Sequence, residues 1–210
     1  DGLYNVGWNA LFIENHDIVR VVSKWGNDKK YWKESSKALA MMYFLQQGTP
    51  FIYQGQELGM TNFERKSIDE FNDISSIDQY YRSIQEGLSE EEALKVINLR
   101  SRDNSRTPFP WNSSEYGGFS KVKPWLGMIE NYKEINAEAQ VGQDDSIYEF
   151  YKKMIDFRQN SIYSECLIYG NITAIDTEND EVIAYTRKDG NETIYCYFNF
   201  SQNKVFEPLN

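Results

Sequence analysis

Polar residues that could bind a ligand follow a short apolar run near the start of the sequence. Residues 10–13 are apolar, and the run Glu-Asn-His-Asp at 14–17 comes next, with Arg20 three residues further on. An Asn-His-Asp triplet at the end of a buried strand offers hydrogen-bond donors and a carboxylate to a neutral polar ligand such as a sugar. The same residues also fit a strand-to-loop turn whose side chains cap the backbone. Spacing alone leaves both interpretations open.

Two further segments carry similar groups. A second apolar run, 50–53, ends in Gln-Gly-Gln-Glu at 54–57, where Gly55 permits a close backbone approach and Glu57 could point toward Asp17. The stretch 100–111 contains Arg102 and Arg106 and ends in a tryptophan. Arginines beside an aromatic ring can bind sugar hydroxyls. More often, however, residues like those at 54–57 only form a turn, and alternating charges like those at 100–106 only form a solvated cluster of salt bridges.

Composition excludes several function classes. The 210 residues carry a formal charge of -10 and have no basic stripe, which argues against a nucleic acid or an anionic membrane surface as partner. His16 is the only histidine, so a multi-histidine metal site is excluded, and we expect neither metal nor cofactor. A cytoplasmic location is favoured by three features of the sequence. Two cysteines cannot form a disulfide framework, no apolar run is long enough to span a membrane, and no signal peptide is visible.

The elements that would position these groups alternate between strand and helix. Residues 30–47 repeat apolar side chains at helical spacing, and Gly48 is placed where a left-handed C-terminal residue belongs. Strand, helix and strand in that order predict a parallel crossover, with polar groups at the ends of both strands. Sites of α/β enzymes lie at such ends.

The rest of the chain changes in character near 160–165. We predict a short helix over 80–85, a helix from the capping box at Ser89 to about Arg100, a long irregular loop over 104–124 and an amphipathic helix over 144–159. Alternating β-rich segments then predict antiparallel strands, with a hairpin turn over 188–191. These strands are 167–175, 182–187, 193–200 and 204–206.

Taken together, the segments 12–17, 49–60 and 102–108 resemble the glycoside hydrolases built on the α-amylase barrel. The similarity is greatest to their α-glucosidase group, which comprises oligo-1,6-glucosidase, dextran glucosidase and trehalose-6-phosphate hydrolase. Gln56 is a mild departure, because the family more often has glutamate at that position. The resemblance extends over nearly the whole chain.

This resemblance implies roles for five residues. Asp17 would be the transition-state stabiliser and would bind the 2- and 3-hydroxyls of the glucose in the cleavage subsite. His16 would hydrogen-bond the same hydroxyls, and Asn15 would be a further substrate-binding residue. Arg102 would help to close the pocket around the non-reducing end, and Arg106 would take this role if the register of the match is different.

The resemblance also implies a fold. Residues 1–162 would form the last quarter of a (β/α)8 barrel, with strands seven and eight and their helices, and 163–210 would begin an antiparallel β-sandwich. The fold class is thus α/β followed by β. The family's aspartate nucleophile and glutamate acid belong to earlier strands, so we expect a fragment that is inactive alone, derived from a retaining, exo-acting α-glucosidase that cleaves terminal α-1,6 or α-1,4 bonds.

Other functions and partners stay open at this point. Within the family, the parent could be a trehalose-6-phosphate hydrolase or a sucrose-converting transglycosylase, and in another class the chain could be a non-catalytic carbohydrate-binding module. Apolar side chains of the two strands require partners, which are either the rest of the barrel or a second copy of the chain. The expected ligand is an α-glucoside oligosaccharide.

Overall fold

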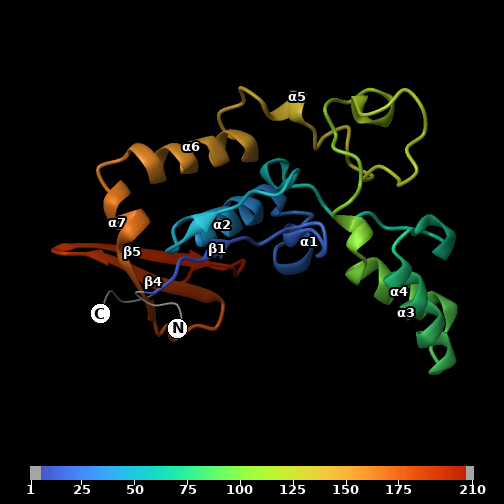
Figure 1. Ribbon diagram of the computed structural model, residues 1–210, viewed down its shortest axis with the longest axis horizontal. Helices are drawn as coiled ribbons and strands as arrows, with labels where there is room; N and C mark the ends of the chain where they lie inside the picture. The colour runs from blue at the N-terminus through green and yellow to red at the C-terminus, as the bar shows by residue number, and fades with distance from the viewer. Residues whose placement is uncertain (1–5, 207–210) are drawn as a thin grey trace.

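The structure is a computed structural model and describes residues 6–206. It consists of a mostly helical first region and a C-terminal β-sheet (Figure 1). In the first, strands β1 and β2 pair in parallel, with Ala10 opposite Thr49. Two helices lie between them in the chain, which confirms the predicted parallel crossover. The bounds of these elements are β1 Ala10–Leu11, α1 Val21–Trp25, α2 Trp32–Phe44, β2 Thr49–Pro50 and the 3-10 helix η1 Gln56–Leu58.

Gly48 sets the close approach of the two strands. A Cβ at this position would lie 2.6 Å from the Asn9 carbonyl oxygen. The residue also has a φ of 140°, a value that residues other than glycine rarely adopt. Helix α2 ends at Phe44, so Gly48 is not its left-handed cap. The prediction of a helix reaching residue 47 was wrong, because the chain must turn into β2 within four residues.

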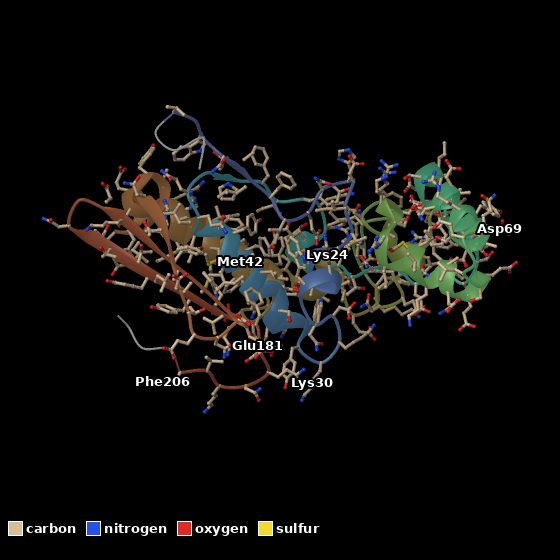
Figure 2. All side chains as sticks on the ribbon, turned by 90° about the horizontal axis from the view of Figure 1, so that it is seen from below. Lys24, Lys30, Met42, Asp69, Glu181 and Phe206 are labelled. Atoms are coloured by element: carbon tan, nitrogen blue, oxygen red, sulfur yellow. The ribbon has the colours of Figure 1, made fainter. Side chains whose placement is uncertain are left out.

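A helical hairpin projects from the main body of the molecule, as Figures 1 and 2 show, with Asp69 toward its far end. It consists of η2 Ile68–Glu70, α3 Ile74–Gln85 and α4 Glu90–Arg100. The Ser89 capping box begins α4 as predicted, with Glu92 as its partner. Helix α3 begins six residues before the predicted helix. Phe71, Tyr80, Ala93 and Ile97 give the hairpin a small hydrophobic cluster of its own.

The segment between the hairpin and the sheet is mostly irregular. Its helical elements are η3 Arg102–Asn104, η4 Glu115–Gly118, α5 Ala137–Gln140, α6 Ile147–Asn160 and α7 Ser164–Tyr169. The loop predicted over 104–124 contains only short 3-10 turns. Ser146 caps α6, so Asp145 lies just before the helix, where Lys33 and Lys37 of α2 contact its carboxylate at 2.9 and 2.7 Å.

The C-terminal part is a three-stranded antiparallel sheet in the order β3-β4-β5. The strands are β3 Asn171–Ile175, β4 Val182–Asp189 and β5 Glu192–Asn199. The predicted start of the first strand at 167 was wrong, because residues 164–169 form α7, which buries Cys166 and Leu167 completely on one face. Residues 204–206 are not a strand, and the Phe206 side chain there is 92% exposed.

Helices and sheet share one hydrophobic core. Side chains of α2, α6 and α7 pack with Tyr185, Cys196 and Phe198 of the sheet. Two buried arginines join the same elements through backbone carbonyls. Arg158 donates to the carbonyls of residues 44, 46 and 48, and Arg187 donates to those of residues 45, 167 and 170. Four of these six carbonyls, those of residues 44, 45, 167 and 170, are in or next to a helix end, where backbone acceptors lack helical partners.

Apolar side chains that directly follow the two parallel strands stay exposed. Phe12 and Phe51 are more than half exposed and Ile52 is 39% exposed, while Ile13 is buried in the core. Phe12, Phe51 and Ile52 line a shallow pocket of about 320 Å³, and we call them the apolar strip. Contiguous exposed apolar side chains of this kind mark surfaces that other segments cover.

Candidate active site

Asp17 lies in the segment that connects β1 to α1 and is the central acidic group of the candidate site. Its side chain is half exposed. The Oδ1 oxygen accepts hydrogen bonds from Arg102 Nη1 at 3.3 Å and from Arg106 Nη2 at 3.0 Å. Both arginines come from η3 and the turn after it, some 85 residues further along the chain. The structure therefore brings three of the predicted site residues into direct contact.

The other two predicted residues fix the backbone around Asp17. The Asn15 Oδ1 oxygen accepts a hydrogen bond from the Asp17 amide at 2.8 Å, which is an Asx turn. His16 places its Nε2 atom 3.3 Å from Asp17 Oδ2, and its carbonyl accepts from Arg106 Nε at 2.9 Å. The predicted turn and the predicted polar cluster are thus both present in one arrangement.

Arg102 has a second carboxylate partner that sequence analysis missed. Its Nε and Nη2 atoms both donate to Asp73 Oδ1, with Nε at 3.2 Å, whereas only Nη1 reaches Asp17. Asp73 is 4% exposed. Burial by itself raises the pKa of Asp73, but hydrogen bonds from Arg102 and Ser76 outweigh it, so the pKa lies below its usual value. Asp73 is therefore an ionised anchor for Arg102.

A buried ion pair lies behind Asp17 and connects three segments. Arg20 donates to Glu14 Oε2 at 3.1 Å, to the Gln54 carbonyl at 2.8 Å and to the Ser105 carbonyl at 3.2 Å. Glu14 Oε1 accepts from the Val21 amide at 2.7 Å. These bonds hold the segments after β1 and β2 against the arginine-bearing turn. Arg20 thus determines how Asp17 and its two arginine partners face each other.

Of the glutamates of the two motifs, Glu14 lies in this buried layer and Glu57 is partly buried. Burial raises the pKa of Glu14, and the nearby Arg20 charge opposes that shift. Burial also raises the pKa of Glu57, whose charge contributes to the upward shift at Glu14. Gln56, the departure from the family pattern, is buried in the core, where its amide nitrogen donates to the hydroxyls of Tyr43 and Tyr151.

The arrangement suits binding of hydroxyl groups. Asp17 and His16 are exposed, and the two arginines contact a single oxygen of Asp17, so other acceptor positions of the carboxylate are open. Glu14 and Asp73 are buried and bonded to arginine, which prevents either from serving as a nucleophile toward a ligand at Asp17.

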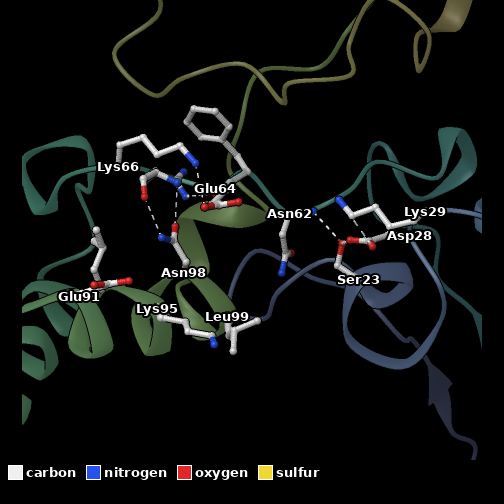
Figure 3. Close-up of a pocket in the computed structure, with 13 residues that line it drawn as sticks. Ser23, Asp28, Lys29, Asn62, Glu64, Lys66, Glu91, Lys95, Asn98 and Leu99 are labelled. Atoms are coloured by element: carbon white, nitrogen blue, oxygen red, sulfur yellow. Dashed lines mark hydrogen bonds and ion pairs between the residues drawn. The ribbon is translucent and has the colours of Figure 1, made fainter. Parts of the chain in front are cut away.

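A larger pocket of about 460 Å³ lies elsewhere, between the segment after α1 and helix α4 (Figure 3). Its polar groups largely satisfy one another. Ser23 donates to Asp28 at 2.7 Å, Lys66 donates to Glu64 at 2.8 Å, and the Asn98 amide exchanges hydrogen bonds with the backbone of Arg65. The polar side chains that converge on one half-exposed carboxylate are those around Asp17. Over residues 6–206, no helix is long and apolar enough to cross a membrane.

Comparisons with known proteins identify two family matches along the chain. Residues 1–170 match the alpha amylase catalytic domain family, and 172–210 match the maltogenic amylase C-terminal domain family. The chain is 49% identical over 193 residues to the probable oligo-1,6-glucosidase 3 of Bacillus subtilis, covering 92% of this chain and 34% of that protein.

Solved structures give the same result. The trehalose-6-phosphate hydrolase of Bacillus licheniformis superimposes with a TM-score of 0.87 at 42% identity, covering 92% of this chain and 34% of that one. The isomaltulose synthase of Erwinia rhapontici NX5 gives 0.87 at 42% identity, with coverages of 93% and 35%. The chain spans about a third of the length of the curated relatives that it matches. On the match over residues 1–170, the chain belongs to the alpha-amylase family.

Proposed function

We propose that this chain supplies the hydroxyl-binding side of the active site in a longer, retaining, exo-acting α-glucosidase. The substrate would be a short α-glucoside oligosaccharide cleaved at its terminal α-1,6 or α-1,4 bond. The observation that supports this proposal is the exposed Asp17 carboxylate between Arg102 and Arg106, next to His16. Relatives named oligo-1,6-glucosidase contribute further support.

In this proposal the fixed charge of Asp17 faces the sugar. Glycoside cleavage passes through an oxocarbenium-like transition state, and a preoriented carboxylate stabilises the positive charge that develops. Hydroxyl hydrogen bonds at the same position strengthen in that state. Arg102 and Arg106 hold the carboxylate in one orientation, and His16 adds a donor or acceptor beside it.

The nucleophile and the general acid would come from other residues of the longer protein. A retaining site needs two carboxyl groups about 5–5.5 Å apart. Near Asp17, the Glu14 and Asp73 carboxylates are already bound to arginines. The chain alone would then be inactive. The apolar strip would be covered by further barrel strands, with self-association of the isolated chain as the alternative that sedimentation would detect.

The finer assignments belong to the same proposal. Residues 1–162 would be the barrel segment, with β1 and β2 as its seventh and eighth strands, and 163–210 would begin the C-terminal β domain. The alternatives are a trehalose-6-phosphate hydrolase and a sucrose-converting transglycosylase, and the structural neighbours named trehalose-6-phosphate hydrolase and isomaltulose synthase support them. A cytoplasmic location stays a prediction from the sequence.

The experiment is turnover of p-nitrophenyl α-glucoside, isomaltose, maltose, trehalose 6-phosphate and sucrose by the full-length protein and by the 210-residue chain. We expect activity only in the full-length protein, and a loss of about 100-fold or more in kcat for Asp17→Asn. Asp145→Asn is the matched control, because Asp145 is exposed and pairs only with lysines of α2. Sugar binding without any hydrolysis by the full-length protein would instead indicate a non-catalytic module.

A further inference from the structure

Arg102 is shared unequally between two carboxylates. Asp73 accepts from two nitrogens along one edge of the guanidinium, and Asp17 accepts from the remaining Nη1 atom at the longer distance of 3.3 Å. The Arg102 side chain is 38% exposed, and its buried partner is Asp73. The direction of the guanidinium is thus set by the hairpin and not by Asp17.

Asp73 is itself held from several sides. It stands at the N-cap position of α3, yet its carboxylate makes no capping hydrogen bond to the helix. Asp73 Oδ2 accepts from Ser76 Oγ at 2.6 Å, and the Asp73 amide donates to the Asp103 carboxylate at 2.9 Å. Asp103, the neighbour of Arg102 in η3, also accepts from the Asn72 amide at 2.7 Å. The two ends of the Asp73–Arg102 contact are therefore joined a second time through the backbone.

We propose that Asp73 is a positioning residue for the sugar site, which acts by holding Arg102 so that only one of its nitrogens can reach Asp17. The inference rests on the proposed function and adds to it a residue from the helical hairpin, outside the motifs that carry the family resemblance. Asp73 does not touch the sugar. Its effect passes through the guanidinium to the carboxylate that does.

The mechanism follows from the geometry of arginine. A guanidinium released from Asp73 is free to rotate and pair with both oxygens of Asp17, which is the preferred arrangement of an arginine with a carboxylate. Such a pair occupies the acceptor positions that the sugar hydroxyls need. Substrate must then displace one charge-assisted hydrogen bond, so we expect KM to rise about 10- to 100-fold. The value of kcat should change less, because Asp17 keeps its charge once the sugar is bound.

The test is Asp73→Asn in the full-length protein, alone and combined with Arg102→Gln, with kcat and KM measured on the preferred α-glucoside. We expect Asp73→Asn to raise KM in the native background and to have no further effect when Arg102 is already glutamine. Asp145→Asn serves as the matched control and should leave both constants unchanged. An equal loss in both backgrounds, or a loss confined to kcat, would overturn the proposal and leave Asp73 a purely structural residue.

Two additions keep this test decisive. If Asp73→Asn fails to fold, Asp73→Glu retains the charge with a longer reach, and its effect must likewise vanish with Arg102→Gln. The Arg102 Nε–H signal in an NMR spectrum reports the contact without any turnover, and Asp73→Asn, whose amide oxygen is a weaker acceptor than a carboxylate, should lower its protection from exchange. A protein with no glycosidase activity but a protected Nε–H would refute the proposed function alone, whereas an unprotected Nε–H in the native protein would refute the role of Asp73.

Discussion

Replacing Arg20 by methionine tests whether the buried layer behind Asp17 stabilises the fold. The substitution keeps much of the side-chain volume and removes the charge, so Glu14 loses its cationic partner while the Gln54 and Ser105 carbonyls lose a donor. Both ends of the ion pair are almost completely buried, with side-chain exposures of 0% and 1%. Removing one partner of such a pair leaves an uncompensated charge in the interior.

The expected cost is large relative to total stability. Breaking a buried pair typically destabilises a protein by about 3–5 kcal/mol, against a total of about 5–15 kcal/mol for a domain. Glu14→Gln combined with Arg20→Met removes both charges and should recover part of that loss, since no ion is then stranded. The difference between the single and double variants measures the charge effect apart from packing.

The loss should also depend on pH, and its sign is determined by Glu14. Burial already raises the pKa of Glu14, and removing Arg20 takes away the charge that opposes this shift. A carboxyl group whose folded-state pKa is raised contributes stability that is fully present below its unfolded pKa, about 4.3, and lost as pH rises through the folded value. The Arg20→Met variant should therefore be less impaired at pH 5 than at pH 8.

Urea unfolding followed by tryptophan fluorescence at the two pH values is the assay. Lys66→Met is the matched control, because it breaks an ion pair whose side chains are about 70% exposed, and it should change the unfolding midpoint little. A loss below about 1 kcal/mol for Arg20→Met, or the same loss at both pH values, would refute the reasoning about the buried pair.

Three other predictions concern the scaffold. Gly48→Ala should lower the free energy of unfolding in urea by at least about 1 kcal/mol, because the new Cβ would meet the Asn9 carbonyl. Gly142 also has a positive φ but lies in open space, so Gly142→Ala should cost less, and equal costs would contradict this account. Lysine hydrogen bonds lower the pKa of Asp145 to about 2, so its ion pairs should persist above pH 4 and be lost as pH falls toward 2; an NMR titration midpoint near 4 would disagree. Arg187→Lys should cost about 2 kcal/mol or more, since one ammonium cannot reach the carbonyls that the guanidinium bonds, and an unchanged melting temperature would count against that account.

The sequence predicted those features that depend on local pattern. Two apolar runs on either side of a segment with helical periodicity predicted the parallel crossover, and the capping box at Ser89 predicted the start of α4. The cluster of Asp17, Arg102 and Arg106 was predicted from motif resemblance, since 85 or more residues separate the aspartate from the arginines. Nothing in their spacing alone would place them in contact.

The missed features depend on long-range contacts. In the sequence, Asp73 has the pattern of an ordinary N-cap aspartate before α3. Its contact with Arg102 depends on how the chain folds and could not be predicted from that local pattern. Residues 167–169 have the β-branched and aromatic composition of a strand, but burying Leu167 against the core favours a helix. Tertiary burial overrides local propensity at such positions.

The two buried arginines that join helices and sheet have a consequence for sequence variation. Arg158 and Arg187 bond only to carbonyl oxygens of the main chain in their strongest contacts, mainly those of residues 44–48. Every amino acid supplies an identical carbonyl, so the acceptor side of this junction imposes almost no requirement on side-chain identity. Substitutions at residues 44–47 should then be tolerated wherever packing permits. The side-chain identity that specifies the attachment belongs to the two donors, Arg158 and Arg187.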